Sequence, residues 1–187
     1  MRPAIEEPYH GPSMVSKNRT AATTSRRTAR TVERRPVAVL GATGTVGQRF
    51  LHLLEGHPWF EVAEVMASDQ SAGKSYEEAV GSRWKLASPI PDAARRLQVK
   101  KPGDRLSARI LFSSLDAAVA GEVETHYARA GHLVSSNARN HRMDPLVPLV
   151  IAEVNRDHLE MLDQQKHPKG GGIVTNPNCS AIVLARA

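Results

Sequence analysis

The sequence contains a single cysteine, Cys179, among 187 residues. One cysteine cannot form an internal disulfide, which argues against a disulfide-stapled secreted scaffold and favours a reducing, cytoplasmic setting. No apolar run approaches the roughly 18 residues that a membrane-spanning helix needs. We therefore expect a protein without a membrane partner.

Excess charge is also missing from most of the chain, although the formal net charge is +6. Residues 1–35 carry eight of the 25 Lys and Arg and three of the 19 Asp and Glu, which leaves 17 basic and 16 acidic residues in the rest. That body lacks the positive surplus that neutralises nucleic-acid phosphates, so we expect no nucleic-acid partner. The segment 1–35 is poor in large apolar residues, and we predict a disordered basic tail. An organelle-targeting segment and a nucleic-acid-binding arm are alternatives.

The histidines lack the spacing of a metal site. None of the eight pairs with Cys or Glu at the intervals of zinc ligands. We expect His126, His132, His141 and His158 to be surface or capping residues, and we predict no metal.

A glycine-rich turn lies between a strand signal and a helix signal. Residues 37–40 form a continuous apolar run typical of a buried parallel strand. Residues 48–55 carry apolar side chains at helical spacing. The turn between them, 41–47, reads G-x-x-G-x-x-G, a relative of the dinucleotide-binding fingerprint.

Each glycine of this turn has a physical role in such a site. Gly41 permits the tight turn, Gly44 lets the backbone approach a pyrophosphate, and Gly47 lets the helix pack on the strand. The phosphates would lie at the helix N-terminus. The turn residues that we predict to bind the cofactor are Gly41, Thr43, Gly44, Thr45, Val46 and Gly47.

The predicted second strand, 60–67, ends where such folds bind the adenosine ribose. An acidic residue there favours the free 2′-OH of NAD, whereas hydroxyls and a cation favour the 2′-phosphate of NADP. The stretch offers both kinds, with Asp69 on one side and Ser68, Ser71 and Lys74 on the other.

The remaining pattern alternates strands with helices, which predicts an α/β, Rossmann-like parallel sheet with helices on both faces. We predict a helix over 117–130, capped by Asp116 and ended by Gly131, and a second helix that Asn155 caps. Residues 75–108 read as irregular, with a short strand near 97–99. The further strands that we predict are 109–112, 132–135 and 173–175.

The lone cysteine follows the last of these strands. A helix-compatible run, 181–185, comes directly after it, which would place Cys179 at a helix N-terminus. The positive end of the helix favours the thiolate, which is the nucleophilic form, and its N–H groups could hold an oxyanion. The alternative is a small buried side chain without chemistry.

Several motifs in this order resemble aspartate-semialdehyde dehydrogenase, of the branch found in archaea and fungi. The resemblance covers residues 36–187. The segments that carry it are 41–47, 71–74, 112–115, 135–143, 147–151 and 176–180.

The resemblance implies a reaction. Cys179 attacks the acyl phosphate of 4-phospho-L-aspartate, phosphate leaves, and NADPH reduces the resulting thioester to the semialdehyde, a step in lysine, threonine, methionine and isoleucine biosynthesis. Asn178 would help to hold the oxyanion. Ser113 and Ser114 would line the cofactor path, and Asn137 and Arg139 would seat phosphate.

The resemblance also implies a domain plan, with an NAD(P)-binding domain over 36–178 and the start of a catalytic and dimerisation domain at 179–187. The family places its catalytic His and substrate Arg in that second domain and forms homo-oligomers at full length. Because the sequence ends at Ala187, we expect a fragment with little or no activity.

Gln70 stands beside Asp69 where the family often has Arg, so NAD is the alternative cofactor. The alternative functions are malonyl-CoA reductase or another cysteine-dependent acyl reductase, and a non-catalytic dinucleotide-binding remnant.

Overall fold

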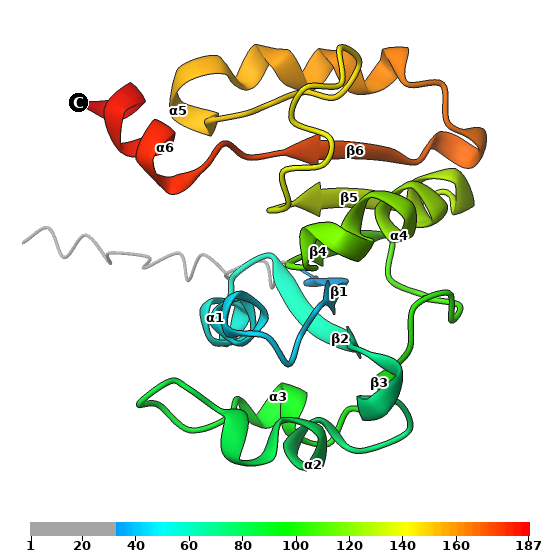
Figure 1. The fold of residues 1–187 in the computed structure, drawn as a ribbon, viewed down its shortest axis with the longest axis vertical. Coiled ribbons are helices and arrows are strands. Elements are labelled where there is room, and N and C mark those ends of the chain that lie inside the picture. Colours follow the sequence, from blue (N-terminus) through cyan, green and yellow to red (C-terminus); the bar gives the residue numbers. More distant parts are fainter. Residues whose placement is uncertain (1–32) are drawn as a thin grey trace, which may run out of the picture. The chain divides into compact units, whose positions relative to one another are not determined.

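Six parallel strands form one sheet in the order β3-β2-β1-β4-β5-β6 (Figure 1). This computed structural model describes residues 33–187, so nearly all of the tail predicted over 1–35 lies outside the described residues, and Arg35 already belongs to β1. The order is that of dinucleotide-binding doubly wound folds, which confirms the predicted Rossmann-like sheet. The strands are β1 (Arg35–Leu40), β2 (Phe60–Met66), β3 (Val99–Lys100), β4 (Ile110–Ser113), β5 (Leu133–Ser136) and β6 (Gly172–Thr175).

Helices cover both faces of the sheet, as predicted. Every helix within 33–187 is too short or too polar to cross a membrane. The α-helices are α1 (Thr45–Leu54), α2 (Tyr76–Val80), α3 (Asp92–Arg95), α4 (Ala117–Ala130), α5 (Ala152–Asn155) and α6 (Cys179–Arg186). The 3-10 helices are η1 (Asp69–Ser71), η2 (Gly81–Arg83), η3 (Arg156–Gln164) and η4 (Pro168–Gly170).

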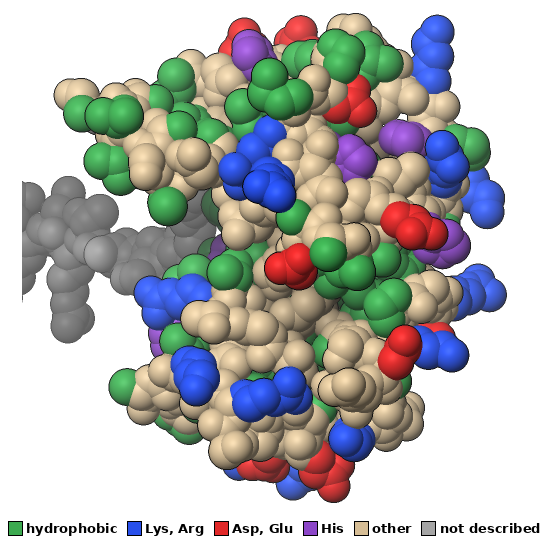
Figure 2. Space-filling view, in the orientation of Figure 1, with side chains coloured by type: hydrophobic (Ala, Val, Ile, Leu, Met, Phe, Trp, Pro, Cys, Tyr) green, Lys and Arg blue, Asp and Glu red, His purple; other side chains and the backbone are tan. Residues whose placement is uncertain are grey.

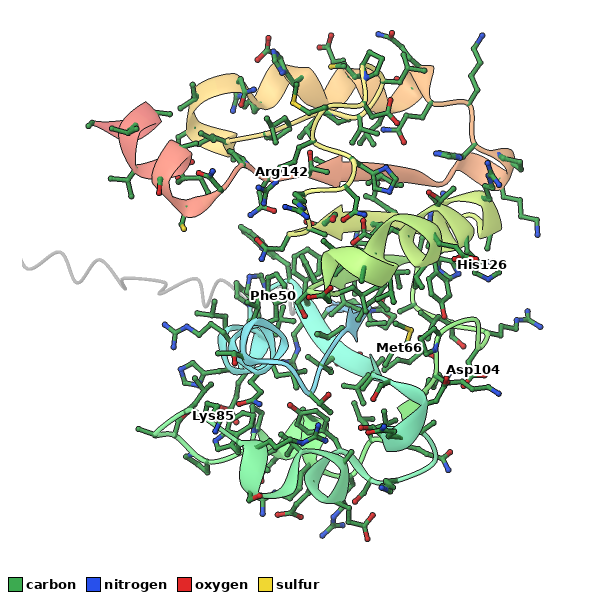
Figure 3. All side chains as sticks on the ribbon, in the orientation of Figure 1. Phe50, Met66, Lys85, Asp104, His126 and Arg142 are labelled. Carbon is green, nitrogen blue, oxygen red and sulfur yellow. The ribbon has the colours of Figure 1, made fainter. Side chains whose placement is uncertain are left out.

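The central strand β1 explains why its sequence is apolar at consecutive positions. Val37 and Val39 pack into a cluster with residues of α1, α2 and α3. Ala38 and Leu40 pack into a second cluster with residues of α4. All four side chains are fully buried, because a parallel strand covered on both faces has no solvent side. Phe50 of α1 extends this packing, with its ring 5.7 Å from that of Phe112 in β4 (Figure 3).

Helix α4 begins and ends where the sequence indicates. The Asp116 side chain accepts a hydrogen bond from the Ala118 N–H at 2.8 Å. Gly131 follows the helix with φ of 105°, a left-handed conformation that favours glycine. Both end signals are local in sequence, so this prediction is confirmed.

Two predictions need correction. The stretch 75–108 is less irregular than predicted: Ser75 and Glu78 form a capping box that starts α2, and Pro91 precedes α3. Asn155 does not cap the segment that follows it, which is the 3-10 helix η3. Its side chain turns back instead, accepting from the Ile151 N–H and donating to the Leu149 carbonyl.

The outer edge of β6 is closed by hydrogen bonds. The Gln165 side-chain amide donates to the Ile173 carbonyl at 2.7 Å and accepts from the Ile173 N–H at 2.8 Å. Further along, the Thr175 N–H donates to the Pro148 carbonyl and the Val150 N–H donates to the Thr175 carbonyl. The backbone groups of Ile173 and Thr175 that point away from β5 are therefore all paired.

Candidate functional site

A cleft of about 590 Å³ opens at the carboxyl edge of the sheet. In the sheet, β1 lies between β2 and β4, and the connections on its two sides cover opposite faces. The cleft lies at this switch point, where ligands of doubly wound folds bind. Residues that follow each of the strands β1 to β5 contribute to its wall. The lining residues are Gly41, Thr43, Gly44, Thr45, Val46, Ala67, Ser68, Asp69, Pro102, Ser114, Leu115, Asp116, Val119 and Asn137.

At two positions of the turn, glycine is required because other backbone atoms approach closely. Gly41 has φ of +74°, and a Cβ there would lie 2.8 Å from the Ser114 carbonyl oxygen. A Cβ on Gly47 would lie 2.3 Å from the Gly41 carbonyl oxygen. Gly44 has more room, with the nearest atom at 3.3 Å, and it is exposed to solvent. The turn is therefore packed on its inner side and open on the side that faces the cleft.

The N-terminus of α1 presents free backbone donors to this cleft. The first hydrogen bond of the helix runs from the Gln48 N–H to the Gly44 carbonyl, so the N–H groups of residues 45–47 have no acceptor within the helix. No side chain caps this end, and its first turn contains no acidic residue. The positive helix end thus fits a pyrophosphate, the group that the sequence predicts at this turn.

Two buried polar side chains hold the turn in place. Gln48 is 1% exposed, donates to the carbonyls of Thr43 and Arg83 at 3.0 and 2.9 Å, and accepts from the Lys85 N–H at 2.7 Å. The Tyr76 hydroxyl donates to the Ala42 carbonyl at 2.8 Å. Burial raises the pKa of Tyr76, so this hydroxyl stays protonated as a donor. Sequence reasoning missed both residues, and a glutamine on the buried side of α1 was the available signal.

The residues predicted to read the ribose separate into two groups. Ser68 and Asp69 are exposed and line the cleft. Ser71 is 2% exposed and lies outside the lining. Lys74 also lies outside it, with its ammonium group donating to the Gln70 carbonyl at 3.0 Å.

The two serines at the carboxyl end of β4 also differ. Ser114 lines the cleft, with its hydroxyl donating to the Leu40 carbonyl at 2.8 Å. Ser113 is fully buried, and its hydroxyl donates to Glu124 at 2.6 Å. Asn137 lines the cleft, whereas the exposed Arg139 lies in a neighbouring hollow formed with residues 116–118 and Asn140.

Cys179 is the first residue of α6 and is exposed, which confirms its predicted position at a helix N-terminus. Asn178 caps this helix, because its side-chain oxygen accepts from the Ala181 N–H at 2.8 Å. Neither residue lines the cleft. A single hydrogen bond links their segment to it, from the Asn176 side chain to the Asn137 side-chain oxygen at 2.8 Å.

A larger hollow, of about 710 Å³, lies at the opposite, amino-terminal edge of the sheet. Arg105, Arg109 and Lys169 contribute to its polar wall, and the His132 ring lies 2.8 Å from the Ala108 carbonyl. It contains neither the glycine turn nor any predicted site residue. We therefore take the smaller cleft as the candidate site, because it contains the N-terminus of α1, although the other hollow has the larger volume.

Comparison with known proteins identifies the domain in which this cleft lies. The family described as "Semialdehyde dehydrogenase, NAD binding domain" matches residues 36–162. The aspartate-semialdehyde dehydrogenase of Cryptococcus neoformans is 49% identical over 152 residues, covering 77% of this chain and 41% of that protein. The Archaeoglobus fulgidus enzyme of the same name is 46% identical, covering 79% of this chain and 43% of that protein. The chain thus spans about two fifths of the length of these curated relatives.

A solved structure shows the same fold. The structure of Candida albicans aspartate-semialdehyde dehydrogenase with NADP has a TM-score of 0.72 and 38% identity, and the match covers 80% of this chain and 44% of that one. The resemblance inferred from the sequence motifs is therefore confirmed. Because the matched domain occupies most of the described residues and contains the whole glycine turn, the chain belongs to the semialdehyde dehydrogenase NAD-binding domain family.

Proposed function

We propose that this chain binds NADP at the glycine turn and forms the cofactor-binding part of an aspartate-semialdehyde dehydrogenase. The observation that carries the proposal is the uncapped N-terminus of α1, which faces a cleft at the switch point of the sheet. The names of the curated relatives support aspartate semialdehyde as a reactant, and the resemblance of the sequence motifs adds 4-phospho-L-aspartate as the partner in the reaction. The Candida albicans relative, whose structure contains NADP, supports the cofactor.

The lining residues suggest how the cofactor is held. The N–H groups of residues 45–47 would bind the pyrophosphate, and Ser68 would face the adenosine ribose. Ser114 and Asn137 would line the path toward the cysteine segment. Ser71, Lys74 and Ser113 do not line the cleft, and the buried Ser113 would support its wall through its bond to Glu124.

The cysteine segment would supply the covalent chemistry. The Cys179 sulfur attacks the acyl carbon, the carbon–oxygen bond to phosphate breaks, and phosphate leaves with the electron pair. NADPH held at the glycine turn would supply the hydride that reduces the thioester carbon. The carbon–sulfur bond breaks last, which releases the semialdehyde and restores the thiolate. The first N–H groups of α6 and the Asn178 amide group would donate to the oxyanion, and Arg139 would seat the phosphate.

Matched charge changes on α1 test the cofactor site. Val46 is 44% exposed and lines the cleft, whereas Leu53 is 56% exposed near the other end of the same helix. Val46→Asp places a carboxylate beside the pyrophosphate and should weaken NADPH binding about tenfold or more, measured by fluorescence titration. Leu53→Asp should leave the affinity unchanged. If the wild-type chain binds neither NADPH nor NADH, or both variants bind alike, the site is wrong.

Asp69 tests the choice between the two cofactors. Its carboxylate lines the cleft, while the nearest predicted cation, Lys74, is held by a backbone carbonyl. Asp69→Asn should tighten NADPH binding about fivefold, the equivalent of about 1 kcal/mol for an exposed charge pair. Affinity for NADH should not rise with it. An unchanged NADPH affinity would place the 2′-phosphate elsewhere.

Acylation of the thiol tests the covalent step. Incubation with 4-phospho-L-aspartate should add one aspartyl group to Cys179 even where no semialdehyde is released, detected by mass spectrometry, and Cys179→Ala should remain unmodified. NADPH binding without any acylation would instead favour a dinucleotide-binding protein that does not catalyse this step.

A further inference from the structure

A buried carboxylate lies beneath the cleft and joins two strand ends. Glu124, in the middle of α4, is fully buried. Its Oε1 atom accepts hydrogen bonds from the Ser113 hydroxyl at 2.6 Å and from the Ser136 hydroxyl at 2.8 Å. These serines are the last residues of β4 and β5. One carboxylate oxygen thus fixes the carboxyl ends of two neighbouring strands.

The other oxygen of Glu124 is poorly satisfied. Oε2 has no hydrogen-bond partner, and it lies 3.8 Å from the Nε2 atom of His141, which is also buried and without a partner. The His141 side chain is 15% exposed, so it lies partly buried against this carboxylate, where the sequence led us to expect a surface or capping residue. Burying a carboxylate with one oxygen unbonded costs free energy, and well-packed apolar residues often stabilise such positions better. Stability alone does not account for a glutamate here.

The two strand ends lead directly to the cleft and to the cysteine segment. Ser114 follows Ser113 and lines the cleft, and Asn137 follows Ser136 and does the same. Asn137 also accepts the hydrogen bond from Asn176, three residues before Cys179. Arg142, which lies near the carboxyl end of β5 (Figure 3), donates to the Asn137 carbonyl at 2.9 Å.

We infer that Glu124 is a positioning residue that holds the cofactor cleft and the cysteine segment in a fixed relation. It lines no part of the cleft and acts through Ser113 and Ser136. The inference rests on the proposed function for its consequence, because a displaced Asn137 would alter both the cleft and the link to Cys179. The structural part of the inference is that one carboxylate holds two strand ends together. This part can be tested without cofactor.

The test compares three variants of the 187-residue chain. Glu124→Leu removes both hydroxyl acceptors, Glu124→Gln keeps one carbonyl oxygen for them, and Glu122→Gln is the matched control, an exposed glutamate on the same helix. Hydrogen exchange should become about tenfold faster in segments 113–115, 136–138 and 176–179 of the Leu variant, with β1 unchanged. Its NADPH dissociation constant should rise about tenfold. The Gln variant should stay within about threefold of wild type in both measurements.

Each other outcome has a defined meaning. Faster exchange in every strand, or wild-type exchange in the three segments, would overturn the positioning role. If Glu124→Leu does not fold, Ser113→Ala decides, because it removes the hydroxyl that ties β4 to Glu124 and should speed exchange in 113–115 about threefold while leaving β1 unchanged. A wild-type chain that binds no dinucleotide would refute the proposed function, while the exchange pattern would still decide the role of Glu124.

Discussion

Replacing Gly47 by alanine would test how tightly the glycine turn is packed. The new Cβ would lie 2.3 Å from the Gly41 carbonyl oxygen and 2.7 Å from the Ala42 Cα, whereas ordinary van der Waals contact begins at 3.4 Å. Both neighbours are backbone atoms, so no side chain can rotate away. We expect the turn and the start of α1 to move apart by about 1 Å, the distance needed to restore contact.

The energetic cost follows from two opposing effects. Overpacking costs about 1–3 kcal/mol, and a backbone clash of this size belongs at or above the upper end. The better helix propensity of alanine returns about 1 kcal/mol. We expect a net loss of about 2 kcal/mol in the free energy of unfolding, and a midpoint lower by about 4–8 °C. NADPH affinity should fall about tenfold or more, because the donors of residues 45–47 would be displaced.

Thermal unfolding followed by circular dichroism, with and without NADPH, measures both effects. Gly121→Ala is the matched control: it lies within α4, and its Cβ would meet only the Asn140 side chain, at 3.0 Å, which can move. That variant should be at least as stable as wild type and bind NADPH normally. If Gly47→Ala unfolds no earlier than Gly121→Ala and binds NADPH as wild type does, the reasoning from the close approach is refuted.

Three further substitutions test other supports, each measured by urea unfolding. Burial raises the pKa of Glu64, but bonds from Lys100 and from two backbone N–H groups outweigh it, so the pKa lies below its usual value. The stabilising contribution of the ionised Glu64 side chain is thus complete above its unfolded pKa of about 4.3, and it is lost as pH falls through its lower pKa in the folded protein. The stability gap between wild type and Glu64→Gln should therefore close below about pH 4, and a constant gap would contradict this. Tyr76→Phe should cost about 1–2 kcal/mol, because the Ala42 carbonyl loses its buried donor; no loss would mean that another donor replaces it. Gln48→Leu removes three hydrogen bonds and should cost about 2–3 kcal/mol and weaken NADPH binding; unchanged binding would show that the turn holds without it.

Local signals explain why much of the fold could be predicted. The buried run of β1, the glycine turn and the ends of α4 each depend on residues close together in sequence, and all lie as predicted. Helix α1 begins inside the glycine motif, at Thr45, earlier than the apolar stripe indicated, because the first turn of a helix carries no required apolar position. The helices α2 and α3 contain five and four residues, which is too short for a helical period to show.

The candidate site depends more on tertiary packing. Ser113 and Ser114 are adjacent in sequence, and only the direction of each side chain decides that one lines the cleft and the other is buried. Glu124 in a helix reads as a solvated side chain, because nothing in the local sequence indicates that two strand-end hydroxyls meet it. Lys74 looks like a cofactor contact in sequence, yet its ammonium group donates to the Gln70 carbonyl.

Figure 2 shows hydrophobic side chains gathered over α6, where Val183 and Leu184 are 68% and 78% exposed. The nearby edge strand β6, however, does not offer unpaired backbone groups at Ile173 and Thr175 to another strand. An unpaired edge strand acts as a template on which a strand from another molecule can add. Here a glutamine amide occupies the bonding positions of Ile173 as a neighbouring strand would, and segment 148–150 occupies those of Thr175. Two copies of this protein cannot join by extending one sheet across β6 unless Gln165 and that segment first withdraw. Contact between two copies on this side must instead be made through side chains. The specificity of such a contact would then depend on the shapes of the side chains and not on backbone hydrogen bonds, which are the same in every strand.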